Sequence, residues 1–409
     1  MDLVRVAESI DRAPSATTIL AGQRPPLLQE AVWAFGLDLL ATTVLWSVMS
    51  LYMAGGLYWL FEMGMYGWRY DDPERVYGPE AVQVRFLTID AESVVQHSVD
   101  RLPDELSDRV VVAEEPIAVD GAEVAVVPDS FECRATNKGR ALEWARRTLE
   151  CDSEFVLYLD EDSHVMEFGG LPDADIVQFT EHPRRTSSLL TYLAEVNRIG
   201  FQIEQRAFPS IAVPLYAWGG GLAVRTSLEA EVTWNYPTVI EDTVFLWRSY
   251  VEADATFSYV LDRVSNQAPP SLWAMFRQRR RWIAGAREDN SILSLDRVLM
   301  YGIRDLSWSV TGLIPVLVVV SYVPLVDLFF FEIYRLVAFV LLAMLFLWVA
   351  IGVYVHRPRR WISVLCFLLA PITTVLHSAG ALWGILSPPE TFEVTTKIEQ
   401  EPDELGQDP

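Results

Sequence analysis

Long apolar segments limit what this chain can fold into. One apolar run covers residues 31–62, and three more follow one another within residues 306–386. Each is long enough to cross the hydrocarbon core of a bilayer, which takes about 20 residues of α-helix. The stretch between them has the mixed composition of a water-soluble domain. The sequence therefore predicts a multi-pass membrane protein with one soluble domain between its membrane segments.

The soluble stretch alternates β-like runs with helical patterns. The β-like runs lie at residues 82–89, 109–113, 123–127, 155–159 and 175–180, and the clearest helical patterns at 139–149 and 187–205. This alternation predicts an α/β domain with a mainly parallel sheet over residues 70–265. The Arg-rich, amphipathic residues 266–305 are expected to form interface helices. There, Leu272, Phe276 and Ile283 make an apolar face that could lie on the bilayer.

The charge composition is unusual. The formal net charge is −23, and Lys138 and Lys397 are the only lysines. An excess of acidic residues with so little lysine is typical of a protein from a halophile. At about 1 M salt the Debye length is about 3 Å, so the repulsion between the many negative charges is screened. An ordinary acidic protein is the alternative. An acidic surface without a basic groove excludes nucleic acid as a partner. Three cysteines without metal spacing indicate a reducing compartment.

Arginine placement predicts the membrane orientation. The loop at residues 356–360 carries three arginines and should be cytoplasmic by the positive-inside rule. Counting back across two spans places the soluble domain on the same side, as the cytoplasmic domain of a cell-membrane protein. The same count places the N-terminal tail, residues 1–30, and the acidic tail, residues 387–409, outside.

Two acidic motifs stand out. Asp160 and Asp162 follow a buried β-like run, and open α/β sheets bind ligands at the carboxyl ends of their strands. Two hard carboxylate ligands suit Mg²⁺ or Mn²⁺, although a solvated acidic turn would look the same. Glu241 and Asp242 open a helical pattern. There a carboxylate can act as a general base, or it can simply favour the helix N-terminus.

Three further elements could bind anions or sugars. Gln278, Arg281 and Trp282 share one helix face. Arginine can bind phosphate and an indole can pack on a sugar ring. A basic helix at the membrane surface would carry the same residues. Lys138 opens a helix, which is a natural anion site, unless it stands there by chance. The loop at residues 218–221 is Gly-rich, so its backbone can approach a ligand closely, or it is a flexible turn.

Taken together, these motifs resemble the processive and lipid-linked family 2 glycosyltransferases, which include the cellulose, chitin and hyaluronan synthases. The resemblance covers residues 82–282, and the Asp-Glu-Asp-Ser pattern is most similar to egghead-type β-1,4-mannosyltransferases. It implies a GT-A-like domain that moves a sugar, with inversion, from a nucleotide-sugar donor to a lipid-linked or growing glycan acceptor. A polyprenyl-phosphate sugar synthase and a non-catalytic receptor or scaffold with a degenerate transferase domain are the competing readings.

The resemblance also implies a role for each motif. It assigns metal and diphosphate binding to Asp160 and Asp162, base catalysis to Asp242 with Glu241 beside it, nucleotide contacts to Thr88, Glu115 and Lys138, and diphosphate and acceptor contacts to Gln278, Arg281 and Trp282. One departure is Glu114-Glu115, which stands where the family has an Asp pair. Residues 392–397 resemble the gating segment of cellulose synthases, which must reach the cytoplasmic site. That requirement conflicts with the span count above. Pro315 and Pro324 in the first C-terminal segment could make that segment re-entrant, which would return the tail to the cytoplasm.

Overall fold

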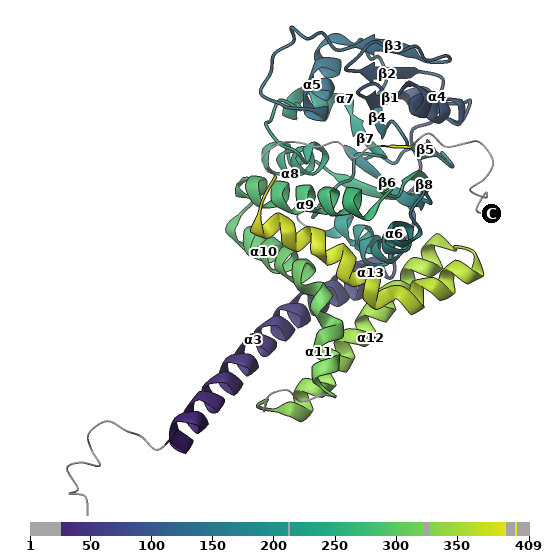
Figure 1. The fold of residues 1–409 in the computed structure, drawn as a ribbon. Coiled ribbons are helices and arrows are strands. Elements are labelled where there is room, and N and C mark those ends of the chain that lie inside the picture. The colour runs from purple at the N-terminus through teal and green to yellow at the C-terminus, as the bar shows by residue number, and fades with distance from the viewer. Residues whose placement is uncertain (1–25, 212, 323–327, 390–396, 399–409) are drawn as a thin grey trace, which may run out of the picture.

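An eight-stranded sheet forms the centre of the soluble domain, in the order β3-β2-β1-β4-β7-β6-β8-β5 (Figure 1). The computed structural model describes residues 26–211, 213–322, 328–389 and 397–398. The strands are β1 (Val82–Thr88), β2 (Arg109–Ala113), β3 (Glu123–Val126), β4 (Phe155–Asp160), β5 (His164–Val165), β6 (Ile176–Arg184), β7 (Leu222–Arg225) and β8 (Phe257–Gln267). The five predicted strands are therefore all present, with small shifts at their ends.

The sheet is mixed, and its two halves differ. The first half pairs β3, β2, β1 and β4 in parallel. The short β7 then runs antiparallel between β4 and β6, while β8 is parallel to β6 and β5 is antiparallel to β8. The α/β class is confirmed, with four of the seven pairings parallel. The sequence reading missed β5, β7 and β8, because the first two are very short and the last mixes polar and apolar residues without alternation.

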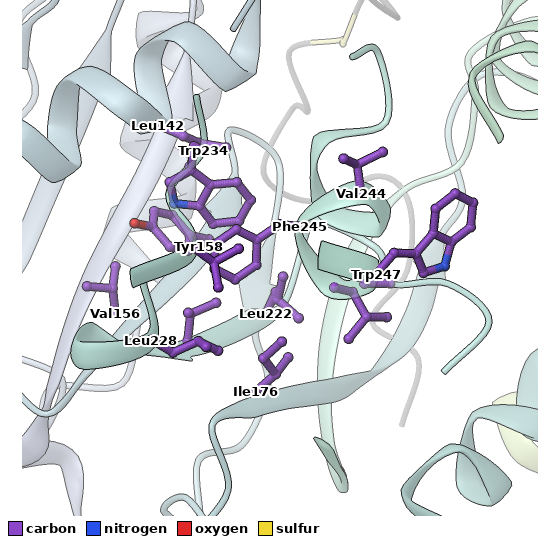
Figure 2. Packing of buried hydrophobic residues seen from close by; sticks show 14 of the residues in the cluster. Leu142, Val156, Tyr158, Ile176, Leu222, Leu228, Trp234, Val244, Phe245 and Trp247 are labelled. Carbon is purple, nitrogen blue, oxygen red and sulfur yellow. The ribbon is translucent and has the colours of Figure 1, made fainter. Parts of the chain in front are cut away.

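Each face of the sheet is buried against helices, because successive residues of a strand point to opposite faces. Val84 and Phe86 of β1 pack in the cluster that includes α4 (Glu92–Asp100), whereas Leu87 packs in the opposite cluster. Figure 2 shows that second cluster, where Trp234 stacks on Phe245 with ring centroids 4.0 Å apart. The helices that supply it are α5 (Lys138–Thr148), α7 (Thr226–Val232) and α8 (Glu241–Ala253). With both faces covered, the edge at the carboxyl ends of the parallel strands is left for ligands.

Four helices are long and apolar enough to cross a membrane, as predicted. The candidate spans are Trp33–Gly67, Leu295–Val320, Phe331–His356 and Arg360–Leu386. The corresponding helices are α3 (Pro26–Glu62), α10 (Leu295–Val310) with α11 (Ile314–Val320), α12 (Phe331–His356) and α13 (Arg360–Leu386). In Figure 1, α3, α11 and α12 extend away from the sheet domain. Large apolar side chains are exposed on all of them, as expected of surfaces that lie in lipid.

The last of these helices does not leave the domain. α13 packs along α9 (Leu272–Asp289) and along α6 (Leu189–Gln202). Its glycines allow this: a Cβ at Gly384 would lie 2.6 Å from the carbonyl oxygen of Arg280. Ile283 is buried against α13, so the prediction that its face lies on the bilayer is wrong for this residue. The apolar face of α9 packs on the neighbouring helix α13. The periodicity of α9 alone does not show whether such a face contacts another helix or lipid.

The tail lies against the sheet domain. Lys397 forms an ion pair with Asp162, so the span count that placed the tail on the opposite side from the domain is wrong. The arginine loop does lie on the domain side, since the ring of His356 lies against that of His182 in β6, tilted by 37° with centroids 4.0 Å apart. The count took α13 as another crossing; α13 is long and apolar enough for one, but it packs along α9 and α6. Residues 392–396 of the gating resemblance and most of the predicted N-terminal tail lie outside the described residues.

Candidate active site

Lys138 brings the two acidic motifs together. Asp160 is the last residue of β4, and its Oδ1 lies 2.6 Å from Lys138 Nζ. The same ammonium lies 3.6 Å from Oε1 of Glu241, the first residue of α8. Residues more than 80 positions apart in the chain thereby share one cation. Neither motif alone was specific in the sequence, but their convergence on the carboxyl end of β4 is typical of a ligand site.

The third acid of the first motif is held from the other side. Asp162 is fully buried, and its Oδ2 accepts a hydrogen bond of 2.6 Å from the main-chain nitrogen of Gln267. Its Oδ1 lies 2.6 Å from Lys397 Nζ. Gln267 also binds the tail, because its side-chain amide exchanges two hydrogen bonds with the backbone of Ile398, at 2.8 and 3.1 Å. The two lysines of the chain therefore sit on the two aspartates of the predicted metal motif.

Asp242 has the surroundings of a general base. Burial and the neighbouring Glu241 carboxylate raise its pKa from 3.8 to about 7, against the opposing charge of Lys138. The Gly-rich loop closes over it, since a Cβ at Gly219 would lie 3.3 Å from Asp242 Oδ2 and 2.4 Å from Lys138 Nζ. A side chain at this position would displace the Lys138 ammonium, whereas glycine leaves both groups where they are. A base with a pKa near 7 is well matched to proton transfer at neutral pH.

The acids are not equivalent electrostatically. Burial opposes ionisation of Asp160, but Lys138 and Lys397 outweigh it, so the pKa of Asp160 lies below its usual value. By contrast, burial raises the pKa of Glu161, whose Oε2 accepts a 2.7 Å hydrogen bond from the Thr88 hydroxyl. Asp160 is thus held as a carboxylate while Asp242 titrates near neutrality. The two carboxyl groups of one site are therefore held in different ionisation states near pH 7.

The arginine-tryptophan motif of α9 borders the same site. Burial lowers the pKa of Arg281, while Glu241, Asp242 and Asp160 oppose that shift, so its guanidinium lies within their field. Trp282 is partly buried, and the guanidinium of Arg279 lies over its ring at 4.1 Å. The Gln278 side-chain oxygen accepts a 2.8 Å hydrogen bond from Arg279. The guanidinium of Arg198 also lies over the Trp282 ring, at 5.7 Å, so cations already occupy part of the indole surface predicted to stack on a sugar.

The sequence reading missed Arg279. It is fully buried, forms an ion pair with Glu195 of α6, and donates a 3.3 Å hydrogen bond to His377 Nδ1 of α13. It therefore fixes Gln278 and Trp282 to two other helices. Nothing in the sequence separates it from the arginines on either side, because burial within the run depends on how α9 packs against α6 and α13.

The predicted nucleotide contacts lie at neighbouring strand ends. Thr88 ends β1 and Glu115 follows β2, so both lie at the carboxyl edge of the parallel half, as does Asp160. Thr88 is buried and bonded to Glu161, whereas Glu115 is exposed. Glu114 is already paired with Arg140 at 2.5 Å. Of the adjacent glutamates, Glu115 is therefore the one whose carboxylate remains open to a ligand.

The donor atoms fit a divalent cation only in part. In the described part of the chain, no three His, Cys, Asp or Glu side chains converge on one metal position. Asp160 and Asp162 offer hard carboxylate oxygens, which suit Mg²⁺ or Mn²⁺ when phosphate oxygens and water complete the shell. Each of these two carboxylates forms an ion pair with a lysine ammonium at 2.6 Å, so a metal would have to compete with the lysines for the same oxygens. The pair therefore fits a divalent metal only if a diphosphate and water supply its remaining ligands.

Comparison with known proteins identifies the domain. Residues 155–351 match the family model described as Glycosyl transferase family group 2. The chain therefore carries a family 2 glycosyltransferase domain, and the prediction of a family 2 glycosyltransferase is confirmed at that level. No curated protein matches the sequence.

Solved structures of two transferases are similar at low identity. One is a mannosyltransferase from Pyrobaculum calidifontis in complex with GDP-Man and Mn²⁺, with 11% identity, a TM-score of 0.45, and coverage of 83% of this chain and 98% of that chain. The other is glucosyl-3-phosphoglycerate synthase from Mycobacterium tuberculosis, with 15% identity, a TM-score of 0.36, and coverage of 55% and 90%.

Proposed function

We propose that the protein is an inverting, metal-dependent glycosyltransferase that works at a membrane. It moves a sugar from a nucleotide-sugar donor to a lipid-linked or growing glycan acceptor. The observation that carries the proposal is the Lys138 ammonium held between Asp160 and Glu241, at 2.6 and 3.6 Å. It joins a diphosphate-binding motif and a base motif in one site of a family 2 transferase domain.

The chemistry is a single displacement. Asp242, with its pKa near 7, takes the proton from the acceptor hydroxyl. The acceptor oxygen forms a bond to the anomeric carbon as the bond from that carbon to the diphosphate oxygen breaks. One displacement inverts the anomeric configuration. The nucleoside diphosphate leaves with the electron pair, and Lys138 and Arg281 offer cations to receive it.

Asp160 and Asp162 would hold the divalent metal. Bound Mg²⁺ or Mn²⁺ would offset charge on the departing diphosphate. Thr88, Glu115 and Lys138 would contact the nucleotide, since they lie at the same sheet edge and site as Asp160. Gln278, Arg281 and Trp282 would border the acceptor, with Arg279 fixing their helix.

The membrane arrangement follows from the helices. α3, α10 with α11, and α12 would each cross the bilayer, while α13 would lie along its surface beside α9. The arginine loop after α12 lies against the sheet domain, and by the positive-inside rule this supports a cytoplasmic position for that domain. Three crossings leave the N-terminus outside and the tail in the cytoplasm, where nucleotide sugars are supplied.

The tail would regulate access to the site. Lys397 occupies Asp162 Oδ1, one of the oxygens proposed to hold the metal. A metal and this ammonium cannot both hold that oxygen, so tail docking and metal binding compete. Residues 390–396, which lead to Lys397, lie outside the described residues.

The test is a donor screen with the purified protein. It is run in detergent at high salt with Mn²⁺, and follows release of UDP or GDP from a panel of nucleotide sugars. Release from one donor that is absent in Asp242→Asn supports the proposal and names the sugar. GDP-mannose would favour a mannosyltransferase of the egghead type, and UDP-glucose or UDP-N-acetylglucosamine a synthase-like enzyme. If a polyprenyl phosphate accepts a single sugar and no glycan grows, the polyprenyl-phosphate sugar synthase replaces this proposal. No release from any donor, even with membrane lipid extract as acceptor, would favour a non-catalytic receptor.

A further inference from the structure

A polar cavity lies next to Asp162, since its lining residues Arg184 and Gln267 both bond that residue. It has a volume of about 150 Å³ and is lined by Ser93, Val94, His97, His164, Arg184, Gln267 and Ile398. These residues come from α4, from the ends of β5, β6 and β8, and from the tail. None of them belongs to the donor and base constellation around Lys138. In Figure 1, the short described piece of the tail lies beside β5, where it lines this cavity.

The cavity carries the positive charge of Arg184. Arg184 donates to the carbonyl oxygen and hydroxyl of Ser265, both at 2.8 Å, and to the carbonyl oxygen of Asp162. Within the described residues, no carboxylate lies within ion-pair distance of Arg184, although the charge of the nearby Asp162 carboxylate acts on it, and its buried Nε has no hydrogen-bond partner. In a chain with a net charge of −23, a half-buried guanidinium bonded only to carbonyl and hydroxyl groups is unexpected.

Two histidines add hydrogen-bonding groups. The rings of His97 and His164 lie 5.2 Å apart, edge to face. Burial, with Arg101 and Arg184 nearby, lowers the pKa of the partly buried His97. Nε2 of His97 is buried without a partner in the described part of the chain, and leaving such a group unsatisfied costs free energy. An occupant that accepts hydrogen bonds would remove this cost.

Size limits the occupant. The cavity volume of about 150 Å³ has room for a phosphate group. The positive charge of Arg184 favours an anion, and arginine geometry suits the oxygens of phosphate.

We propose that this cavity is a binding site for a phosphate-sized oxyanion, separate from the site of the donor diphosphate. Arg184 supplies the charge and His97 a ring nitrogen to hold it. Gln267 links the site to the rest of the molecule, because it lines the cavity, bonds Asp162 through its main chain, and bonds Ile398 through its side chain. An anion in the cavity would therefore be coupled through Gln267 to Asp162, a proposed metal ligand, and to the tail. The phosphate comes either free in solution or on a lipid headgroup.

Direct binding tests the proposal without any need for transferase activity. The full chain in detergent, at fixed ionic strength and without donor, is titrated calorimetrically with orthophosphate and, separately, with short-chain phosphatidic acid. One molecule should bind per chain. His97→Leu should weaken binding at least tenfold, and Val94→Trp, which fills the cavity, should abolish it. Gln96→Leu is the matched control, since Gln96 lies beside His97 but bonds Asp100 and Asp120 instead of lining the cavity.

Each result has a defined meaning. Lys138→Gln removes a cation of the donor site, so binding that survives in this variant and disappears in His97→Leu supports the separate site. Binding of phosphatidic acid alone assigns the phosphate to lipid, and binding of orthophosphate assigns it to solution. Absence of binding for both ligands overturns the proposal, as does binding lost in Lys138→Gln but kept in His97→Leu. If Val94→Trp fails to fold, His97→Leu with its thermal midpoint measured decides alone. The donor screen is unaffected by any of these outcomes.

Discussion

The pH profile of sugar transfer depends on the surroundings of Asp242. Its pKa is raised to about 7 by burial and by Glu241, and a base works only when ionised. Below that pKa, the ionised fraction falls about tenfold per pH unit. We therefore expect kcat/KM to be level above pH 8, to fall about tenfold at pH 6, and to fall about 100-fold at pH 5. An aspartate with the usual pKa of 3.8 would still be ionised at pH 5 and give a flat profile.

The assay is initial-rate release of nucleoside diphosphate at saturating metal, with donor binding measured over the same pH range. The folded-state pKa lies above the usual value, so ionisation of Asp242 destabilises the folded state as pH rises through 7. This group therefore does not cause unfolding in acid, and a thermal midpoint at each pH checks that no other group does. Asp242→Asn serves as the control and should leave only a low rate without this dependence. A wild-type kcat/KM that stays constant from pH 5 to pH 8 would refute the assignment of Asp242 as the base.

Three further predictions concern the metal, the tail and the buried network. EDTA should stop transfer, and Mn²⁺ or Mg²⁺ should restore it; full activity in chelator would remove the metal role of Asp160 and Asp162. Lys397→Gln should lower the Mn²⁺ concentration for half-maximal activity roughly fivefold, as expected if an ion pair worth about 1 kcal/mol competes with the metal. Lys397→Arg keeps the positive charge and should leave this concentration unchanged. An unchanged Mn²⁺ requirement in both variants would exclude competition between the tail and the metal. Glu195→Gln leaves the fully buried Arg279 without its carboxylate partner, which costs about 3–5 kcal/mol when a buried pair loses one member. The thermal midpoint of this variant should fall by several degrees. A midpoint equal to wild type would show that the hydrogen bonds of Arg279 to His377 and Gln278 are enough to stabilise the buried guanidinium.

The periodic parts of the fold were predictable because their signals are local. The runs that became β1, β2 and β4 are short and rich in apolar residues, and the helical patterns at residues 139–149 and 187–205 correspond to α5 after β3 and α6 after β6. The membrane-length helices were evident from hydropathy alone. By contrast, β7 has only four residues, and it enters the sheet because β4 and β6 present open edges on either side. Such pairing depends on distant strands, which no local pattern encodes.

For the site, the sequence determined which side chains were available, and the tertiary structure decided which of them meet. Asp160, Asp162, Asp242 and Lys138 could be singled out by residue type and position at the ends of predicted elements. Packing decided the contacts that these residues make. Lys138 lies between two motifs, Lys397 pairs with Asp162, and Arg279 holds α9 to α6. The physical reason is range. Secondary structure follows from spacings of two to four residues, whereas a site joins charges far apart in the chain, and only the burial of several helices against one sheet brings them within hydrogen-bonding distance.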